Sequence, residues 1–481
     1  MALTRISWLV AVTVVAMGLL AEVQLWAVAA ITTTTTGRGG TDPGQSTKHR
    51  AQQRQHKRAN VLVTMQPTGN ELFAKIKGQK FSSRGHRVTA LRDGLENLAK
   101  ESQRGVHELL GKVSDSFARS ESFWITNQVY VQQATPDLVK QLEKAPGVQS
   151  VEFEMIFPSS LPVLSTPSMS SSTSAAQWGV SKINAPDVWA TGNTGQGVVI
   201  GSIDTGVRAT HEALASSYRQ SYGWYDPEAK ASAPYDSTGH GTHVLGIMVG
   251  QYGFGVAPGA TWMACKGCRA QGCYGSDLLA CFQFMLCPTT PSGTAKDCSK
   301  APNIVNNSWG GGQGLTMFDG VINAWRAAGI IPVVAAGNTG PNCGTIASPG
   351  DSASVITVGA TDINDGLASF SSKGPTVRGL RKPDVAAPGA LVLSSCWTDD
   401  SSYCFKSGSS MAAPHVTGAI ALYLSANPGT SYDKIKDVLQ SRSVTTTLTT
   451  PTGYACGKTQ DRKFPNNQYG YGRIDIFNAL S

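Results

Sequence analysis

The sequence predicts an α/β protein with a mostly parallel sheet between two layers of helices, a three-layer arrangement preceded by a small α+β unit. Three observations lead to this prediction. Short apolar runs recur along the C-terminal two thirds of the chain, helical patterns separate several of them, and residues 60–157 show a mixed pattern of their own. With 481 residues, 41% of them hydrophobic, the chain can bury more than one core, which excludes a wholly disordered protein.

Residues 1–29 have the features of a secretory signal peptide. Arg5 precedes an apolar run of 15 residues, Ile6 to Leu20, and Ala27-Val28-Ala29 offers the small residues that a signal peptidase accepts. A membrane-spanning helix needs about 20 apolar residues, so a membrane anchor is the disfavoured alternative. We therefore expect a secreted, extracellular protein with no membrane partner.

Two linkers flank the small α+β unit. Residues 30–59 contain five consecutive threonines and a polar, basic stretch that we expect to be disordered, and residues 158–176 are rich in Ser, Pro and Thr. Within residues 60–157, β-favouring residues predict strands and steps of three and four predict helices. The expected strands are Val61–Met65, Phe123–Val131 and Val148–Ile156, and the expected helices are His86–Phe117 and Thr135–Lys144.

The second domain, residues 177–481, shows the alternation that is typical of a parallel sheet. Val198–Ile203 is a continuous apolar run, as expected of a strand that is buried on both faces. Similar runs occur at Trp262–Ala264, Ile304–Val305, Ile330–Ala336, Val355–Val358 and Ala390–Leu393. Helical patterns cover His243–Val249, Ser276–Leu286, Thr316–Ala328 and Met411–Ser425.

The charge distribution argues against a nucleic-acid-binding protein. The net charge is +8, and 15% of the residues are charged. Residues 1–160 hold 19 basic and 13 acidic side chains, so the rest of the chain has a net charge of only +2. Because binding to nucleic acid depends on a concentrated positive surface, we expect no nucleic-acid partner.

All ten cysteines lie between Cys265 and Cys456. An even number in a secreted chain favours disulfides. Cys265-Lys-Gly-Cys268 could instead be half of a zinc site, but a second pair with matching spacing is missing. Among the many connectivities that ten cysteines allow, the expected pairs are Cys268–Cys273, Cys265–Cys281, Cys287–Cys298 and Cys396–Cys404, which leaves Cys343 and Cys456.

Three segments carry residue types that act together in acyl transfer. Asp204-Thr205-Gly206 follows a predicted strand, His240-Gly241-Thr242-His243 opens a predicted helix, and Gly408-Ser409-Ser410 precedes another. A serine hydroxyl needs an adjacent base, an imidazole can take its proton and later protonate the leaving amine, and a carboxylate can fix the imidazole tautomer. Ser410 would also gain free N–H groups at a helix N-terminus, with Pro414 expected in the first helical turn.

Each segment alone has other interpretations. Asp-Thr-Gly also occurs in aspartic proteases, but these need two such carboxylates, and no second Asp-Thr-Gly or Asp-Ser-Gly is present. A metal site at His240 and His243 lacks a third ligand nearby in the sequence, and a cysteine-rich metal-binding module is excluded by the cysteine spacing. The order Asp, His, Ser across the three segments therefore favours one catalytic set.

With these motifs the chain resembles the subtilisin family of serine proteases, which has this order of residues. The resemblance runs from Gln177 to Leu480 and includes the segments Trp178–Pro186 and Gly470–Asp475. It implies the three-layer subtilisin-like fold, with Asp204 as the orienting acid, His240 as the general base and Ser410 as the nucleophile. His243 and His415 are expected to be structural.

The same resemblance implies an oxyanion donor and a substrate-binding edge. Val333–Asn338 matches the family segment that ends in the oxyanion asparagine, so Asn338 takes that role with the Ser410 amide. Asn307–Gly311 matches the edge that binds substrate as an added strand, through Ser308, Trp309 and Gly310. Because the loop Thr339–Pro349 beside the primary pocket has no Asp or Glu, we expect an apolar or broad preference.

The chain departs from bacterial subtilisins at their tight calcium site. Only Ile247–Phe254 separates the helix from Gly255-Val256-Ala257-Pro258, and Ala213 stands where an aspartate ligand is expected. We predict that the strong calcium site is absent, that weak structural calcium remains open, and that catalysis needs no cofactor and no metal ligand.

The implied protein is a secreted serine endopeptidase made as an autoprocessed zymogen. Residues 60–157 resemble the family's inhibitory propeptides, so the expected partners are protein or peptide substrates and the chain's own propeptide, with the enzyme itself a monomer. Self-cleavage should fall between Phe157 and Gln177, with Phe157 and Leu161 as candidate apolar residues for the cut. The alternative is a catalytically silent relative that acts as a binding protein.

Overall fold

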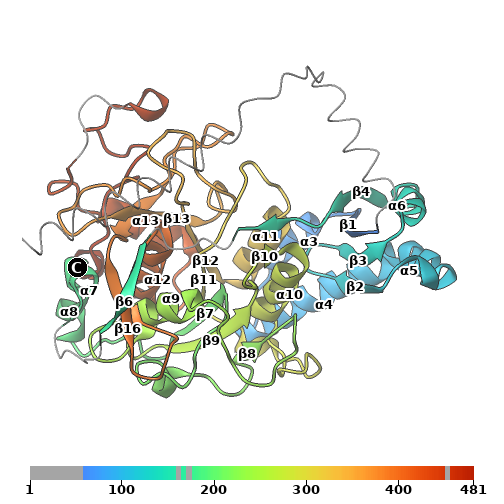
Figure 1. Ribbon diagram of the computed structural model, residues 1–481, viewed down its shortest axis with the longest axis horizontal. Coiled ribbons are helices and arrows are strands. Elements are labelled where there is room, and N and C mark those ends of the chain that lie inside the picture. The colour runs from blue at the N-terminus through green and yellow to red at the C-terminus, as the bar shows by residue number, and fades with distance from the viewer. Residues whose placement is uncertain (1–57, 159–163, 170–175, 450–454) are drawn as a thin grey trace, which may run out of the picture. The chain divides into compact units, whose positions relative to one another are not determined.

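The computed structural model describes residues 58–158, 164–169, 176–449 and 455–481 (Figure 1). Its largest sheet has seven strands in the order β14-β13-β12-β11-β7-β9-β8, and every neighbouring pair is parallel. The strands are β7 (Val199–Asp204), β8 (Trp224–Tyr225), β9 (Thr261–Lys266), β11 (Ile304–Asn307), β12 (Ile331–Ala335), β13 (Ile356–Thr361) and β14 (Val385–Pro388).

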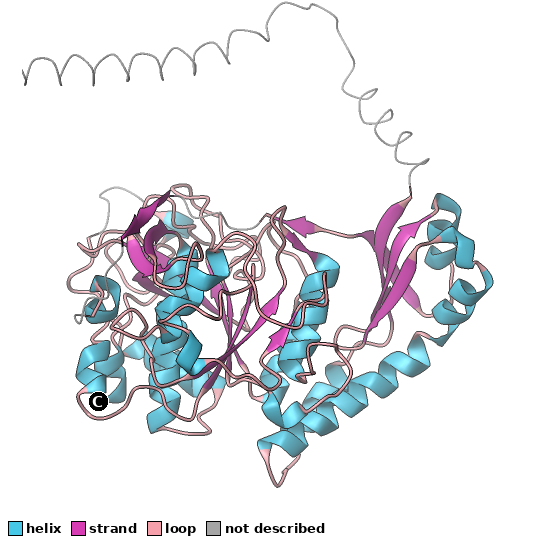
Figure 2. Ribbon diagram, turned by 60° about the horizontal axis from the view of Figure 1, so that its bottom comes forward, coloured by secondary structure: helices cyan, strands magenta, loops and turns pink. Residues whose placement is uncertain are grey.

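Helices cover both faces of this sheet (Figure 2). Ile304 packs in one core with helices α9 and α12, whereas its neighbour Val305 packs in a second core with α10 and α11. Because successive residues of a strand point to opposite faces, both faces of β11 are buried, which explains the continuous apolar runs. The predicted three-layer α/β fold is confirmed. The helices of this part are α7 (Trp178–Lys182), α8 (Ala185–Trp189), α9 (His240–Val249), α10 (Gly275–Leu286), α11 (Asp319–Ala328), α12 (Ser409–Ala426), α13 (Tyr432–Ser441) and α14 (Ile476–Leu480).

The N-terminal α+β unit contains an antiparallel sheet in the order β2-β3-β1-β4. One face holds Val63 and Val129 in a core with the unit's own helices α5 and α6, while Leu62 and Phe123 on the other face join the core around α10 and α11. The elements are β1 (Ala59–Met65), α3 (Asn70–Gly78), α4 (Arg84–Ser102), α5 (Arg104–Lys112), β2 (Arg119–Phe123), β3 (Gln128–Ala134), α6 (Pro136–Glu143) and β4 (Val148–Phe153).

Two elements of this unit differ from their predictions. The single helix expected over His86–Phe117 is two helices, because α4 ends at Ser102 and α5 begins at Arg104. The single strand expected over Phe123–Val131 is a hairpin, since the chain turns between β2 and β3 with Asn127 at a φ of 54°. Asparagine tolerates this left-handed conformation better than most residues.

Two small antiparallel sheets complete the described structure. The first has the order β15-β16-β6, from β15 (Val392–Ser395), β16 (Tyr403–Ser407) and β6 (Leu164–Met169). The second pairs β10 (Cys273–Tyr274) with β5 (Ile156–Phe157). The run Ala390–Leu393 was expected in the parallel sheet but contributes to β15, and β6 lies inside the segment predicted as the second linker.

Four of the five disulfides are the predicted ones. Four bridges have the predicted partners, and the two remaining cysteines, Cys343 and Cys456, form the fifth. The alternative of a zinc half-site at Cys265 and Cys268 is wrong, because each of these sulfurs is bonded to another cysteine. Cys343–Cys456 links positions 113 residues apart, so it ties the loop beside the predicted primary pocket to the C-terminal part of the chain.

The segment predicted as a signal peptide, residues 1–29, lies outside the described residues, as does most of the first linker. Among the helices of the described ranges, none has both the length and the apolar character that crossing a membrane requires.

Candidate active site

Asp204 is the last residue of the central strand β7, at the carboxyl edge of the parallel sheet. Its Oδ1 lies 2.7 Å from Nδ1 of His240, and both side chains are buried. The same oxygen accepts a hydrogen bond of 2.8 Å from the N–H of Thr205, which fixes the carboxylate against the imidazole. Ligand sites of open α/β sheets lie at this edge, so the strand delivers the carboxylate to the expected place.

Asp236, which belongs to none of the predicted motifs, holds the N-terminus of the histidine's helix. Its Oδ1 accepts from the N–H groups of Thr238 and Gly239, and its Oδ2 accepts from the N–H and hydroxyl of Thr242. These bonds satisfy donors that a helix start leaves free, so Asp236 positions His240 without touching its ring. An aspartate four residues before a helix-opening histidine is the signal that could have identified it.

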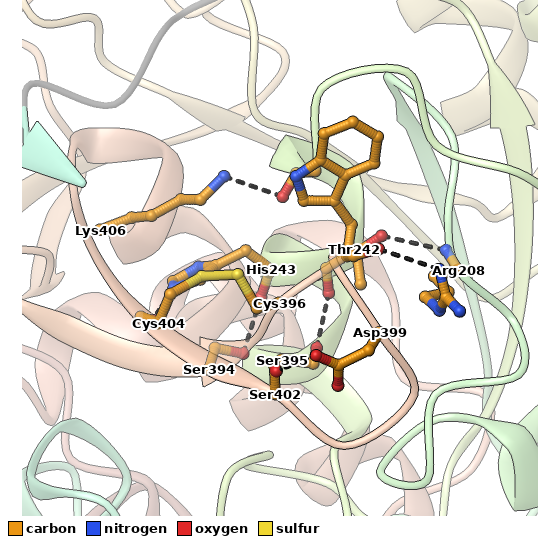
Figure 3. Close-up of a disulfide and its surroundings, with 12 residues drawn as sticks. Arg208, Thr242, His243, Ser394, Ser395, Cys396, Asp399, Ser402, Cys404 and Lys406 are labelled. Atoms are coloured by element: carbon orange, nitrogen blue, oxygen red, sulfur yellow. Dashed lines mark hydrogen bonds between the residues drawn. A yellow bond between two sulfur atoms is a disulfide. The ribbon is translucent and has the colours of Figure 1, made fainter. Parts of the chain in front are cut away.

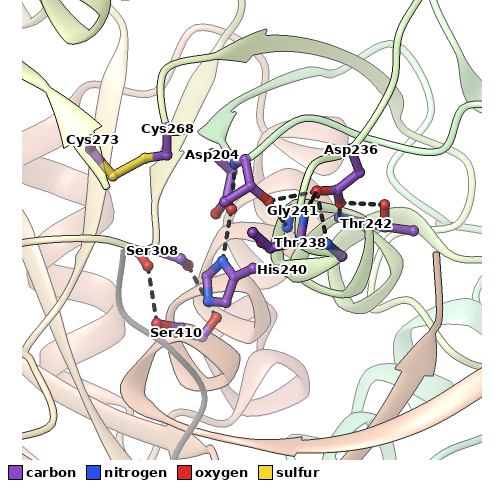
Figure 4. Close-up of polar contacts among 12 residues, drawn as sticks. Asp204, Asp236, Thr238, His240, Gly241, Thr242, Cys268, Cys273, Ser308 and Ser410 are labelled. Atoms are coloured by element: carbon purple, nitrogen blue, oxygen red, sulfur yellow. Dashed lines mark hydrogen bonds and ion pairs between the residues drawn. A yellow bond between two sulfur atoms is a disulfide. The ribbon is translucent and has the colours of Figure 1, made fainter. Parts of the chain in front are cut away.

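Ser410 is the second residue of α12, and the His240 ring lies between it and Asp204 (Figure 4). The Ser410 hydroxyl donates to the carbonyl of Ser308 at 3.0 Å. Among the described residues, Nε2 of His240 has no hydrogen-bond partner. The free imidazole nitrogen is therefore available to a hydroxyl that turns toward it.

Pro414 corrects one sequence expectation. It was placed in the first turn of its helix, but it is the sixth residue of α12. A proline at this position cannot donate to the carbonyl four residues earlier, which belongs to Ser410. That carbonyl instead accepts from the Ser308 hydroxyl at 3.0 Å. Pro414 thus leaves the Ser410 carbonyl without its helical donor, and the Ser308 hydroxyl binds this carbonyl instead.

Asn338 lies beside the same turn with its amide oriented by Ser409. Its Oδ1 accepts from the Ser409 N–H at 2.8 Å and from the Ser409 hydroxyl at 2.9 Å. Because Oδ1 accepts both bonds, the Nδ2 group of Asn338 points away from Ser409. A Cβ built on Gly408 would lie 3.2 Å from Asn338 Nδ2 and 3.6 Å from the Ser410 nitrogen. Gly408 therefore leaves open a space that two N–H donors border.

The predicted substrate-binding edge follows strand β11. Ser308 is buried by its contacts with Ser410, and Trp309 is 2% exposed within an aromatic cluster that includes Phe157, Phe282 and Phe318. A Cβ on Gly310 would lie 2.8 Å from the carbonyl of Ser348, so only glycine fits this close approach. Phe157 belongs to the N-terminal α+β unit, which therefore reaches the edge itself.

Lys406 is a further residue near the histidine, and no sequence motif indicated its position. It is 6% exposed, and its Nζ donates to the carbonyl of Gly239 at 2.8 Å. Burial lowers the pKa of this ammonium, and the carboxylates of Asp236 and Asp204 oppose that shift. The contact ties strand β16 to the residue that precedes His240.

His243 and His415 are buried by packing. Nε2 of His243 lies 2.9 Å from the carbonyl of Cys404, and Nδ1 of His415 lies 2.8 Å from the carbonyl of Met411. Burial lowers the pKa of His243 well below its usual range and the pKa of His415 to about 4. Both rings are therefore neutral at pH 7 and lie in the interior.

These depressed pKa values predict a loss of stability in mild acid. Below about pH 6.5 the unfolded chain protonates both imidazoles while the folded chain does not, so the free energy of unfolding falls as the pH drops toward 4. For His415 alone the change is about 3 kcal/mol. Thermal melting of a Ser410→Ala chain from pH 7 to pH 4.5 should show this fall, and His415→Asn should reduce its slope. An equal slope in both chains would contradict the account.

The residues around Ala213 do not fit a tight calcium site. Such a site needs about six to eight oxygen ligands, whereas the Ala213 methyl is fully buried in an apolar cluster with Phe254 and Tyr403. The rings of Phe254 and Tyr403 stack with centroids 3.9 Å apart. Apolar packing therefore occupies the place where the family resemblance implies a ligand.

A chelator is accordingly expected to have little effect on stability. Melting of the Ser410→Ala chain with and without excess EDTA should give midpoints that differ by less than about 10 °C. Removing a tightly bound structural metal would cost several kcal/mol and would lower the midpoint by more than this. A larger decrease that added calcium reverses would show that a strong site exists.

Comparison with known proteins agrees with the fold. Residues 195–472 match the model of the subtilase family. The chain is 35% identical to bacillopeptidase F of Bacillus subtilis (strain 168) over 456 residues, which cover 87% of this chain and 31% of the relative. It is 37% identical to the serine protease AprX of the same organism over 290 residues, 52% of this chain and 61% of the relative.

A third relative is covered almost completely. The chain is 34% identical to subtilisin DY of Bacillus licheniformis over 270 residues, 55% of this chain and 90% of that protein. By contrast, the chain spans about a third of bacillopeptidase F and about three fifths of AprX. The match over residues 195–472 includes Asp204, His240 and Ser410, and on this evidence the chain belongs to the subtilase family.

Proposed function

We propose that the chain is a secreted serine endopeptidase, made as an autoprocessed zymogen, that cleaves peptide bonds with Asp204, His240 and Ser410. The observation that carries this proposal is the 2.7 Å contact between Asp204 and His240 beside Ser410, in a member of the subtilase family. The names of the serine protease AprX and of subtilisin DY support the same reaction.

In the proposed reaction, the Ser410 hydroxyl turns from the Ser308 carbonyl to His240 Nε2 and attacks the substrate carbonyl. His240 takes the hydroxyl proton, and the Asp204 carboxylate stabilises the resulting imidazolium and fixes its tautomer. When the tetrahedral intermediate collapses, His240 protonates the leaving amine and the acyl group stays on Ser410. Water, activated by the same imidazole, then releases the acid product and restores the serine.

The negative charge of the intermediate would lie in the space that Gly408 leaves open. Asn338 Nδ2 and the Ser410 N–H would donate to it there. Donors that are already oriented need no reorganisation during the reaction, which is why such sites contribute strongly to rate.

This assignment predicts the effect of two substitutions. Asn338→Asp keeps an oxygen for the Ser409 N–H but replaces the donor by a negative charge, and Gly408→Ala adds a methyl group 3.2 Å from Nδ2. Asn338→Asp should lower kcat by at least about 10²–10³-fold, the loss known for the oxyanion asparagine of a subtilisin, with a smaller change in KM. Gly408→Ala should also lower kcat, because its methyl group occupies the space proposed for the oxyanion. Steady-state kinetics on a peptide p-nitroanilide measure both constants, and equal rates in variant and parent would contradict the role of this space.

Substrates would add as an extended strand along the edge of Ser308, Trp309 and Gly310. Phe157 lies at that edge as a substrate side chain would. Its ring centroid is 6.3 Å from that of Trp309 and 5.3 Å from that of Phe318. Its strand β5 pairs with β10, in the manner of an added substrate strand. We therefore propose an apolar or aromatic preference upstream of the cut, and a cut that follows Phe157 within the range up to Gln177.

The N-terminal α+β unit is proposed to act as folding assistant and inhibitor. Glu154 accepts from the N–H and hydroxyl of Ser276 at the start of α10, and Gln283 accepts from the N–H of Trp124. Arg84 donates to the carbonyls of Ala301 and Pro302. These contacts join the unit to α10 and to the residues that precede β11, which supports an inhibitor that stays bound until it is degraded.

Hydrolysis of casein tests the proposed function. The purified chain should hydrolyse casein, and a serine-directed inhibitor should abolish the activity while a chelator should not. Absence of hydrolysis after the N-terminal unit has been removed would favour the silent binding protein instead.

A further inference from the structure

The N-terminal α+β unit contacts the second domain, residues 177–481, at a place that is separate from the catalytic residues. Helices α3 and α4 both contact α11, and α4 also contacts Cys298–Lys300 (Figure 1). Phe73 of α3 and Leu91 of α4 are buried in one core with Trp325 of α11. Two helices of the N-terminal unit therefore cover an apolar face of the second domain.

This contact lies at the edge of the parallel sheet opposite to the catalytic residues. Ala301 and Pro302 precede strand β11, whereas Ser308 follows it. Because β7 and β11 are parallel and in register, Ser308 lies at the same edge as Asp204 at the end of β7. About six extended residues separate Pro302 from Ser308, which corresponds to roughly 20 Å. A contact at Ala301 and Pro302 therefore does not by itself block the catalytic residues.

The loop that contacts α4 is a closed hairpin. The Cys287–Cys298 disulfide joins its two ends, and Thr289 and Lys296 pair antiparallel within it. By contrast, the hairpin that Cys396–Cys404 closes is bonded to helix α9 on the catalytic side (Figure 3). The Cys287–Cys298 hairpin thus presents a surface of fixed shape on the other side of the sheet.

The first turn of α4 fits closely against the residues that follow this hairpin. Arg84 donates from its two Nη atoms to the carbonyls of Ala301 and Pro302. A Cβ built on Gly85 would lie 3.0 Å from Cβ of Ser299, so a residue without a side chain allows the close approach. The contact combines apolar burial with hydrogen bonds of definite geometry, as specific interfaces do.

A charge pair completes the contact at its solvent-exposed rim. The Glu96 carboxylate of α4 forms an ion pair with Nζ of Lys296, and the two side chains are 30% and 38% exposed. Either charge can therefore be reversed without burying an unpaired charge. Arg92 lies farther from Glu96, at 3.7 Å, and pairs with Asp93 at 2.7 Å.

We propose that the Cys287–Cys298 hairpin, Ala301, Pro302 and α11 form a binding surface outside the catalytic cleft, here called the amino-edge surface, whose occupant is the helix pair α3–α4. This inference rests on the proposed inhibitor role of the N-terminal unit and adds its regulation. Self-cleavage of the chain breaks no contact of these helices. The amino-edge surface therefore sets how long the N-terminal unit stays bound after the cut, and the kind of partner it fits is an amphipathic helix pair.

The time course of activation tests the proposal in the full chain. Each variant is folded by dilution from denaturant with its disulfides intact, and hydrolysis of a peptide p-nitroanilide is followed until the rate is constant. Lys296→Glu brings two carboxylates together, so the lag before full activity should shorten about threefold or more. Glu96→Lys alone should have the same effect, and both substitutions together should restore the lag. The final kcat/KM should be equal in all four chains, because neither residue belongs to the catalytic site.

Two glycines provide a matched pair of substitutions. Gly85 and Gly105 are each the second residue of their helix, but a Cβ on Gly105 meets no atom within 4 Å. Gly85→Leu should push α4 away from Ser299 and shorten the lag about tenfold, whereas Gly105→Leu should leave it unchanged. In the full Ser410→Ala chain, the amides of Arg84–Ser102 should exchange with solvent at least about tenfold faster in Gly85→Leu than in Gly105→Leu.

The possible outcomes separate this inference from the functions on which it rests. A lag that neither Lys296→Glu nor Gly85→Leu changes, in chains with normal final activity, overturns the inference. So does a further shortening, in place of restoration, when both charges are exchanged. A parent chain without any lag contradicts the inhibitor role, and a chain that gains no activity even after removal of the N-terminal unit contradicts the proposed endopeptidase.

Discussion

Replacing Ser410 with alanine is expected to abolish hydrolysis and to leave the chain uncut. The hydroxyl is the only proposed nucleophile, and among the described residues Nε2 of His240 has no hydrogen-bond partner that could take its place. The expected loss in kcat is about 10⁶-fold, the size known for removing the nucleophile of a subtilisin. Kinetics on a peptide p-nitroanilide and the mass of the purified chain measure both effects.

The neighbouring serine provides the control for this substitution. Ser409 also sits in the first turn of α12, where its hydroxyl donates to Asn338 and accepts from the Gly337 N–H. Ser409→Ala should therefore reduce the rate through Asn338 while the chain still matures. A Ser410→Ala chain that matured when purified alone would exclude self-cleavage, and one that kept its rate would exclude Ser410 as the nucleophile.

Replacing Asp204 with asparagine is expected to lower kcat by about 10⁴-fold with little change in stability. The carboxylate accepts the Nδ1 proton of His240 at 2.7 Å and so leaves Nε2 free to take the serine proton. An asparagine amide can donate to Nδ1 instead, which moves the ring proton to Nε2 and blocks the base. Steady-state kinetics and thermal melting separate the two effects.

Asp236→Asn is the matched control, because it removes a buried charge nearby that does not touch the ring. Asp236 accepts four hydrogen bonds at the start of α9 and a fifth from the Thr205 hydroxyl. Its loss should lower the melting temperature more than the loss of Asp204 and lower kcat less. If Asp204→Asn acted mainly on stability, the account of Asp204 as an orienting acid would be wrong.

The elements that the sequence predicted best are those whose side chains are buried on both faces. Val199–Asp204 is buried on both faces, so its composition alone indicates a central strand. The hairpin after Phe123 was missed because Trp124 and Ile125 favour strands, although they lie in the turn between β2 and β3. Helix α3 was missed because its pattern is weak, with only Phe73 and Ile76 buried.

The candidate active site also contains residues that the sequence predicted and residues that it could not predict. Asp204, His240 and Ser410 stand in short segments whose residue types suggest their chemistry, and these side chains lie together in the structure. Lys406 and Pro414 could not be assigned from sequence, because their roles depend on which carbonyl lies opposite them after folding. A lysine on a strand and a proline in a helix carry no local signal for such contacts.

Covalent labelling of the active serine tests the central claim most directly. The matured chain is treated with a fluorophosphonate probe, which reacts with activated serines, and the modified residue is located by peptide mass spectrometry. The account predicts one label, on Ser410, with loss of activity in proportion to labelling, and no label in the Ser410→Ala or His240→Ala chain. A label on another residue, or full activity after Ser410 has been modified, would contradict it.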